Sequence, residues 1–315
     1  MEKRLFSAAT SFPGVVRLAN RFDGRNAIIT GAAHGIGAAT ARLIAREGGK
    51  VVAADIDEEG LAALCEGAEG RIVPARCDVL ETGDIEAAIN QCADTFGGVD
   101  IVFSNAGASG PSSTVEQVSD NDLDRMMHMH LRAALAAIRA AVPHMRKRGG
   151  GSIVLTTSVS GMRQGYAPVL YSLSKGSLIQ LAEIAAVELA RDMIRVNCVC
   201  PGFVPTAIFA RSMGFTEKTS AKFARRLDDP AKNAQPLPRA CTPDDIAEAV
   251  AYLTSDAGSF VTGQTLTVDG GLSLTPGPGD SRAVYAPIIS ALGLDPAEVE
   301  PGPAVWSKLG LDKKS

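Results

Sequence analysis

The sequence predicts an α/β fold in which a doubly wound parallel sheet carries helices on both faces. Short runs of apolar and β-branched residues alternate almost without exception with longer segments at helical spacing. This alternation requires crossover connections, which join parallel strands. The chain has 315 residues and is 46% hydrophobic, so it can bury a sizeable core. We therefore expect one large α/β domain.

The expected elements follow one another in order along residues 23–274. Each strand is a short apolar run, and each helix is a longer segment with apolar residues three and four apart. Strands are expected at 26–30, 50–55, 71–79, 99–104, 151–157, 194–200 and 264–270, and helices near 36–48, 57–66, 81–96, 116–147, 171–191 and 243–255. Residues 1–22 form a leader, and residues 275–315 form an extension whose Pro and Gly content disfavours long regular structure.

Composition excludes several functional classes. The formal net charge is −4 and the basic residues are dispersed, which argues against a nucleic-acid partner. No apolar run approaches the roughly 20 residues of a membrane span. The six cysteines show no paired CxxC spacing, so neither a metal site nor a disulfide framework is expected. We expect a soluble, cytoplasmic protein.

A glycine-rich turn follows the first strand. In "TGAAHGIG", Gly31, Gly35 and Gly37 have a GxxxGxG spacing, with His34 and Ile36 between them, and the turn leads into the first helix. Glycines there let the backbone turn tightly and approach a pyrophosphate at the positive end of the helix. The position between a strand and a helix favours a dinucleotide site over a glycine turn without a ligand.

The next strands end in residues suited to the rest of a dinucleotide. Asp55 ends the second strand, where a carboxylate can bind an adenosine ribose and repel a 2'-phosphate. No basic residue follows it directly and the glycine turn carries His34 rather than arginine, so NAD is favoured over NADP. The alternative for Asp55 is a turn residue at a strand end. Asp78 ends the third strand near the expected adenine, and Asn105 begins a small-residue turn after the fourth.

A candidate catalytic group follows the fifth strand. Ser158 directly follows that strand, and thirteen residues later Tyr171 and Lys175 lie four apart in "YSLSK". This spacing puts the phenol and the ammonium on one face of a helix. A nearby positive charge lowers the pKa of a tyrosine, so we expect Tyr171 to be a general acid or base.

These motifs together resemble the short-chain dehydrogenase/reductase family. They are "TGAAHGIG", "CDV", "NAG", Ser158, "YSLSK", "IRVNCVCPGFVPT" and "VTGQTLTVDGG". They occur in the family's order and spacing from about residue 23 to residue 274. The resemblance covers neither the leader nor the C-terminal extension.

The resemblance implies a single-domain Rossmann fold with a seven-stranded parallel sheet, and hydride transfer between NAD(P) and an alcohol or carbonyl. It implies that Tyr171 donates or accepts the proton, that Ser158 holds the substrate oxygen, and that Lys175 binds the nicotinamide ribose. The residues expected at the cofactor are Gly31, His34, Gly35, Ile36, Gly37, Asp55, Asp78, Val79, Asn105, Ala106, Gly107, Tyr171, Lys175, Pro201, Gly202, Val204 and Thr206.

Two histidines lie close together in "MMHMH". His128 and His130 are two residues apart, which is about 200° around a helix, so they cannot share a metal ion. His130 occupies the position where the resembled family typically has an asparagine that helps hold a proton-relay water. It is a candidate catalytic residue that relays protons with a pKa near neutrality. It could instead block the water, or be a buried histidine without a role. His128 is expected at the surface or at a subunit contact.

The substrate-binding residues are expected on two segments. A lid of about residues 203–240 begins apolar and becomes charged, and a second segment lies between Ser158 and Tyr171. Together they favour a small-molecule secondary alcohol or ketone with an apolar body. The expected residues are Phe203, Ile208, Phe209, Met162, Gln164 and Tyr166.

Two further expectations come from the resemblance. The family commonly forms tetramers, so a homo-oligomer, tetramer or dimer, is expected. The leading function is an NAD-dependent alcohol dehydrogenase or ketone reductase. The alternative is an NAD(H)-binding regulatory or scaffold protein in which His130 has impaired turnover.

Overall fold

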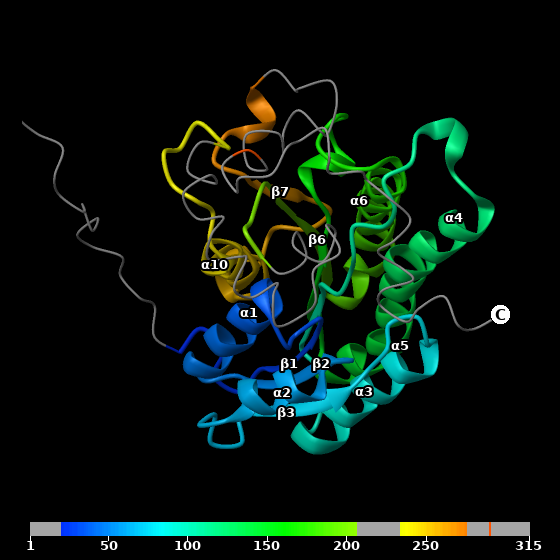
Figure 1. Ribbon diagram of the computed structural model, residues 1–315. Coiled ribbons are helices and arrows are strands. Elements are labelled where there is room, and N and C mark those ends of the chain that lie inside the picture. Colours follow the sequence, from blue (N-terminus) through cyan, green and yellow to red (C-terminus); the bar gives the residue numbers. More distant parts are fainter. Residues whose placement is uncertain (1–19, 207–233, 276–289, 291–315) are drawn as a thin grey trace, which may run out of the picture.

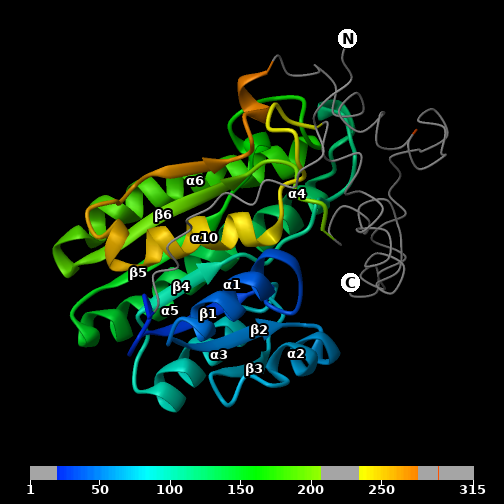
Figure 2. The same ribbon diagram turned by 90° about the vertical axis from the view of Figure 1, so that its left-hand side faces the viewer.

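A seven-stranded parallel sheet forms the centre of the computed structural model, which describes residues 20–206, 234–275 and 290. The strand order is β3-β2-β1-β4-β5-β6-β7, which can be followed in Figures 1 and 2 together. The strands are β1 (Asn26–Thr30), β2 (Lys50–Asp55), β3 (Ile72–Arg76), β4 (Ile101–Ser104), β5 (Gly151–Thr156), β6 (Ile194–Pro201) and β7 (Thr265–Val268). The predicted doubly wound fold is confirmed. The order reverses between β1 and β4, which opens a crevice at the carboxyl ends of these strands.

Helices cover both faces of the sheet (Figures 1 and 2). One face carries α1 (Gly35–Arg46), α2 (Glu58–Cys65) and α10 (Pro243–Thr254). The other carries α3 (Thr82–Phe96), α5 (Ala133–Arg148) and α6 (Val169–Leu189), while α4 (Asp120–Met127) precedes α5. These bounds agree with most of the helices predicted from the sequence to within a few residues.

The two helical layers explain the apolar strand sequences. All five residues of β1 are buried, and they alternate between two cores: Ile28 packs under α3 and α5, whereas Ala27 and Ile29 pack under α1 and α10. A strand covered on both faces has no side that favours polar residues. A continuous apolar run is therefore the expected signature of such a strand.

The long helix predicted at 116–147 is interrupted. A π-helical turn, His128–Arg132, separates α4 from α5, and a short 3-10 turn precedes α4. The Ser119 side chain accepts a hydrogen bond from the Asp122 amide, so the α-helix begins at residue 120 instead of 116. A π turn holds one extra residue in the helix, and such turns are frequent at functional sites.

The end of the segment assigned to the leader packs on the domain. Phe22 is fully buried in the core beneath α1. Arg21 lies beside it and forms ion pairs with Glu47, at 2.5 Å, and with Glu248, at 2.7 Å. Residues 21 and 22 therefore belong structurally to the α/β domain.

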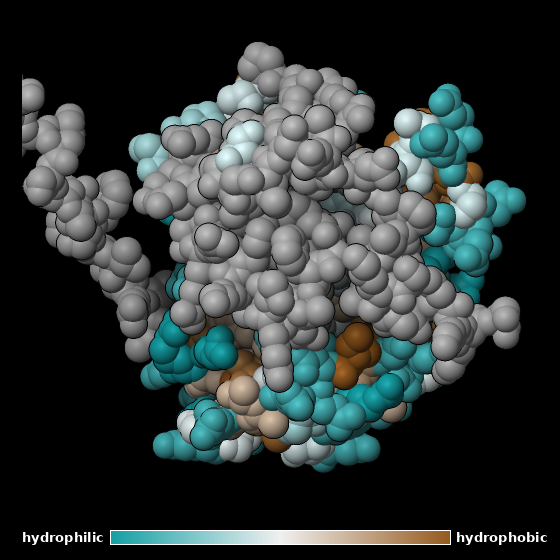
Figure 3. Space-filling model, in the orientation of Figure 1, coloured by the Kyte–Doolittle hydropathy of each residue, from teal (hydrophilic) through white to brown (hydrophobic). Residues whose placement is uncertain are grey.

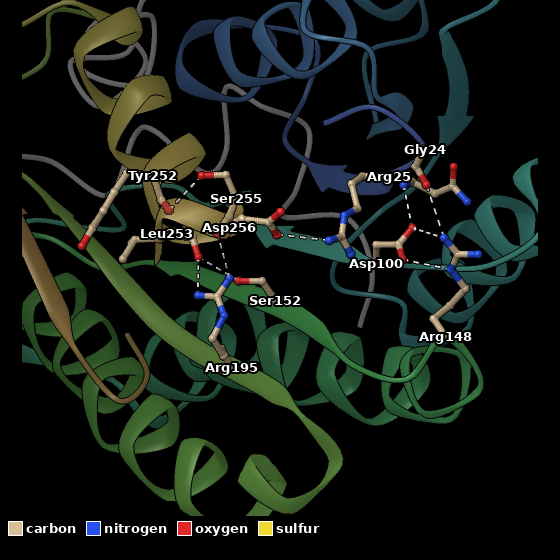
Figure 4. Close-up of polar contacts among 11 residues, drawn as sticks. Gly24, Arg25, Asp100, Arg148, Ser152, Arg195, Tyr252, Leu253, Ser255 and Asp256 are labelled. Carbon is tan, nitrogen blue, oxygen red and sulfur yellow. Dashed lines mark hydrogen bonds and ion pairs between the residues drawn. The ribbon is translucent and has the colours of Figure 1, made fainter. Parts of the chain in front are cut away.

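Charged residues stabilise the amino-terminal edge of the sheet (Figure 4). Asp100 is 4% exposed and accepts hydrogen bonds from the Asn26 amide and from Arg148. Arg195, at the start of β6, donates to the Leu253 carbonyl at the end of α10. These contacts lie at the edge opposite to the glycine turn.

The described surface visible in Figure 3 is mostly hydrophilic around α2 and α3, with a few apolar residues among the polar ones. Among the residues that the structure describes, no helix is both long and apolar enough to cross a membrane.

Candidate active site

The glycine turn lies at the carboxyl end of β1, where its backbone approaches the turn after β4. Gly31 has a φ of 65°, and a Cβ there would lie 2.8 Å from Ala106 Cα. A Cβ on Gly37 would lie 2.1 Å from the Gly31 carbonyl oxygen. Both positions therefore require glycine. Gly35 begins α1, so the amides of the first turn of that helix face the crevice where a pyrophosphate would bind.

The structure brings the last of the predicted cofactor residues next to this turn. A Cβ on Gly35 would lie 3.4 Å from Thr206 Cγ2. Pro201 ends β6, and the Gly202 amide donates to the Val268 carbonyl of β7. Val204 is half-buried against the core beneath α1. The segment after β6 thus returns to the start of α1. Gly35 and Thr206 are neighbours there, although they lie 171 positions apart in the chain.

Asp55 ends β2 beside the glycine turn, as predicted. One carboxylate oxygen accepts a hydrogen bond from the Ala33 amide at 3.0 Å, and the other accepts from the Asp57 amide at 3.1 Å. The Asp57 side chain caps α2 and pairs with His34 at 2.5 Å. Two carboxylates and one imidazole therefore lie where a dinucleotide ribose would be bound.

The residues that are expected to lie beside the adenine of the cofactor follow β3 in the chain. Asp78 accepts a hydrogen bond from the Leu80 amide, and its own amide donates to Asp84. Val79 packs partly buried against the core. Ile56, which the sequence interpretation did not include, follows Asp55 with its apolar side chain 62% exposed. In the sequence, the signal for Ile56 is an apolar residue directly after the acidic residue that ends a strand.

Hydrogen bonds of Asn105 join the carboxyl ends of three strands, β1, β4 and β5. The Asn105 amide donates to Thr30 Oγ1 at 3.0 Å, and Asn105 Nδ2 donates to the Thr30 carbonyl at 3.1 Å. Thr156 Oγ1 donates to Asn105 Oδ1 at 3.2 Å. Asn105 therefore connects the end of β1, which leads into the glycine turn, to the end of β5, which leads to Ser158. Ala106 and Gly107 follow in the same turn.

Ser158 and Tyr171 meet as predicted. Their side chains are hydrogen-bonded to each other, and both residues are half-buried. Ser160 Oγ also donates to Ser158 Oγ, at 3.0 Å. Burial raises the pKa of Tyr171 to about 12, and the hydrogen bond with Ser158 only partly offsets this. The prediction that Lys175 lowers this pKa is therefore wrong in this structure.

The position of Lys175 explains why its positive charge does not lower the pKa of the Tyr171 phenol. Its Nζ lies 5.7 Å from the centre of the Tyr171 ring and donates to the Thr156 carbonyl at 2.7 Å. Lys175 is 3% exposed, and burial lowers its pKa to about 8. The ammonium is thus held by the end of β5, on the same face of α6 as Tyr171.

His130 faces this site from the π turn. It is 2% exposed, and its ring meets the Tyr171 ring edge to face, with 5.7 Å between the centroids. Burial and the charge of Lys175 lower the pKa of His130 well below its usual range. The expectation of a pKa near neutrality is therefore wrong, because the imidazole is buried beside a cation.

Ser174, which the sequence interpretation missed, is the hydrogen-bond partner of His130. Its Oγ lies 2.8 Å from His130 Nδ1. A serine between Tyr171 and Lys175 in "YSLSK" is a visible signal, but its partner comes from a distant element. His128, two residues before His130, is half-buried. Among the described residues, no cluster of three His, Cys, Asp or Glu side chains could hold a metal ion.

The predicted substrate residues divide into three groups. Met162 and Gln164 are exposed between Ser158 and Tyr171, as a substrate-facing segment requires. Tyr166 and Phe203 are buried, and the Tyr166 hydroxyl donates to the Leu272 carbonyl at 3.1 Å. Ile208 and Phe209, with most of the predicted lid, lie outside the described residues.

Known proteins resemble this chain over most of its length. A family model described as enoyl-(acyl carrier protein) reductase matches residues 31–273. Momilactone A synthase of Oryza sativa subsp. japonica is 38% identical, over 81% of this chain and 92% of the relative. Cis-4-hydroxycyclohexanecarboxylate dehydrogenase of Sinomonas cyclohexanicum is 36% identical, over 79% and 97%. A short-chain dehydrogenase/reductase structure from Burkholderia xenovorans has a TM-score of 0.73 and 31% identity, and covers 82% of this chain and 100% of that one.

The doubly wound sheet, the glycine turn and the group of Ser158, Tyr171 and Lys175 define an oxidoreductase of the class that uses a nicotinamide cofactor. More specifically, the chain belongs to the short-chain dehydrogenase/reductase family.

Proposed function

We propose that the protein is an NAD-dependent oxidoreductase that transfers a hydride between the cofactor and a secondary alcohol or ketone with an apolar body. The observation that carries this proposal is the hydrogen bond between Ser158 and Tyr171 beside the buried ammonium of Lys175. A phenol and a hydroxyl that converge on one point can bind and deprotonate an alcohol oxygen. The bound nicotinamide would supply the hydride acceptor or donor.

Tyr171 is the proposed general acid and base. In alcohol oxidation the phenolate form of Tyr171 takes the hydroxyl proton while hydride leaves the carbinol carbon, and in reduction the phenol form gives a proton to the substrate oxygen as hydride arrives at that carbon. Ser158 holds the substrate oxygen by its hydroxyl. Lys175 binds the nicotinamide ribose, and its ammonium lies 5.7 Å from the centre of the Tyr171 ring. His130 is proposed to act on the Lys175 side of the site, through water.

Asp55 supports the preference for NAD. Its carboxylate is held by two backbone amides at the end of β2, and Asp57 adds a second carboxylate nearby. Either charge would repel a 2'-phosphate, and an adenosine ribose would donate hydrogen bonds to Asp55.

The substrate class rests on the apolar residues around the site and on the names of relatives. Met162 is exposed beside the catalytic segment, and the relative from Sinomonas is named for a cyclic secondary alcohol. We propose a small molecule of this type, not a nucleic acid or a membrane, as the partner. A homo-oligomer, dimer or tetramer, is proposed from the family's usual assembly.

The test is the formation of NADH from NAD with a panel of secondary alcohols that includes cyclic, steroid and aryl members. Turnover that depends on Tyr171 supports the proposal. Tight NADH binding without turnover of any alcohol or ketone would instead support the regulatory or scaffold alternative, in which His130 impairs catalysis. Ser177→Ala is a matched control for variants of the catalytic residues on α6, since Ser177 lies on that helix and, among the described residues, its hydroxyl donates to the Ser174 carbonyl.

A further inference from the structure

Ser174 connects His130 to the catalytic helix. It is fully buried on α6, directly before Lys175. Its hydroxyl donates to the Tyr171 carbonyl oxygen at 3.0 Å, and its oxygen lies 2.8 Å from His130 Nδ1. A serine hydroxyl has one hydrogen to donate. Since that hydrogen is used by the carbonyl, the serine oxygen is the acceptor and His130 Nδ1 carries the proton.

The surroundings of the other ring nitrogen lead to the same tautomer. His130 Nε2 is buried and has no hydrogen-bond partner among the described residues. A Cβ on Gly107 would lie 2.6 Å from this Nε2 and 3.4 Å from Lys175 Nζ, so both nitrogens face the same side of Gly107. An ammonium can only donate. A lone pair on Nε2 is therefore favourable, whereas an N–H there would lack an acceptor and would face a cation.

We propose that Ser174 is a positioning residue that locks His130 as the neutral Nδ1–H tautomer, so that Nε2 presents a fixed hydrogen-bond acceptor to the Lys175 side of the active site. The assignment of the tautomer stands on the contacts of Ser174, Gly107 and Lys175. Its catalytic meaning rests on the proposed function, in which Lys175 binds the cofactor.

The lock changes what His130 can do with a proton. In a pass-through relay, a proton would arrive on Nε2 and another would leave from Nδ1. Here the Nδ1 proton points only to Ser174, and the Ser174 proton points only to a peptide carbonyl, which does not pass protons on. A proton that binds Nε2 must therefore leave from Nε2. His130 is thus a hydrogen-bond acceptor on the Lys175 side of the site, for a water molecule or for the ammonium itself, and does not pass a proton through its ring.

The charges around the imidazole agree with this role. Lys175 approaches from α6 and disfavours the imidazolium form, and the edge contact with the Tyr171 ring adds no negative charge. Among the described residues, Lys175 is the charged group that acts on His130.

The direct test is the tautomer itself. The full chain is labelled with ¹⁵N-histidine, and long-range ¹H–¹⁵N spectra are recorded at pH 7.5 without ligand. His130 is assigned as the signal set that disappears in His130→Asn. The expected pattern has a protonated Nδ1 and an unprotonated Nε2. A protonated Nε2, or an imidazolium, at this pH would overturn the proposal, whether or not the protein turns over any alcohol.

Two serine variants test the lock. Ser174→Ala removes the acceptor, and the Nδ1–H to Nε2–H ratio of His130 should fall about fivefold to tenfold, the value of one net hydrogen bond. Ser177→Ala is the control, because Ser177 makes the same contact with the carbonyl three residues back, at 2.7 Å. It should leave the ratio unchanged. An unchanged ratio in Ser174→Ala would show that Ser174 is not the lock.

Activity separates this inference from the proposed function. If the enzyme turns over alcohols, Ser174→Ala should lower kcat and change the pH profile of kcat, while Ser177→Ala should do neither. If no variant, including the wild type, turns over any alcohol, the proposed function fails, and the spectra still decide the tautomer.

Discussion

The Asp55 carboxylate at the end of β2 accepts a hydrogen bond from the Ala33 amide of the glycine turn, with 3.0 Å between the nitrogen and the oxygen. The acidic group and the turn are therefore held as one unit. A negative charge fixed by the backbone cannot swing away from a 2'-phosphate as a charge on a loose loop could. The distance between these two residues thus bears directly on the choice of cofactor.

Replacing Asp55 tests this choice. In Asp55→Asn, we expect the ratio of kcat/KM for NAD to that for NADP to fall about fivefold or more, because removing a charge about 4 Å from a phosphate is worth about 1 kcal/mol even in water. Steady-state kinetics with both cofactors measure the ratio. Asp78→Asn is the control and should leave it unchanged. If Asp78→Asn lowered the ratio as much as Asp55→Asn, Asp55 would act only through the overall negative charge of the site and not through its position.

The Tyr171 hydroxyl is expected to be essential. Tyr171→Phe removes the acid/base but keeps the ring, so kcat should fall by about 10²- to 10⁴-fold while the Kd of NADH changes little. Fluorescence titration with NADH measures the binding. Tyr166→Phe is the control, because the Tyr166 hydroxyl donates to the Leu272 carbonyl away from the reacting atoms. Retained activity in Tyr171→Phe would remove Tyr171 from the mechanism.

The buried thiols predict a loss of stability at alkaline pH. Burial raises the pKa of Cys92 from 9.0 to about 12, so the folded protein keeps a proton that the unfolded chain loses. The stabilisation is complete below pH 9 and is lost as the pH rises toward 12. In Cys92→Ala, the fall in the free energy of unfolding above pH 9 should be shallower by up to about 1.4 kcal/mol per pH unit.

Urea unfolding under reducing conditions, at intervals from pH 7.5 to 10.5, measures this slope. Cys65→Ala is the control, since Cys65 is only partly buried and should change the slope less. Equal slopes for the wild type and Cys92→Ala would contradict a raised thiol pKa at that position.

The two ion pairs drawn in Figure 4, Arg148–Asp100 and Arg25–Asp256, should differ widely in their contribution to the free energy of unfolding. Arg148→Ala leaves the buried Asp100 with one backbone donor, so we expect a loss of roughly 2 to 4 kcal/mol in the free energy of unfolding. Arg25→Ala breaks a pair with Asp256, which is 91% exposed, and should cost less than about 0.5 kcal/mol. Urea unfolding of both variants tests the difference, and similar losses would contradict the role assigned to burial.

The fold was predictable because its signals are local. Each strand is an uninterrupted apolar run since both faces of the sheet are covered, and the glycine spacing follows from close backbone contacts such as that of Gly31 with Ala106. The separation of Tyr171 and Lys175 by four residues likewise predicts one helix face. These features are read from a few neighbouring residues.

The remaining features depend on contacts that hydropathy does not encode. The π turn leaves the pattern of apolar residues almost unchanged, so residues 116–147 read as one helix. Ser174 gains its importance from His130, which lies 44 positions away. The pKa of Tyr171 rises because burial outweighs the hydrogen bond with Ser158, and the sequence contains no measure of either effect.

The π turn also has a consequence for chain length. Because the π turn holds one extra residue, the deletion of a single residue within 128–132 could restore a regular α-helix while α4 and α5 keep the faces that they bury. Each residue of a regular helix advances its direction by about 100°, so the side chains inside the turn, including that of His130, would point in new directions, whereas Met126 would stay in the core. The number of residues in this turn, and not their identity alone, therefore decides which side chain the helix presents to Lys175, and homologous chains of different length at this point would need a different residue there.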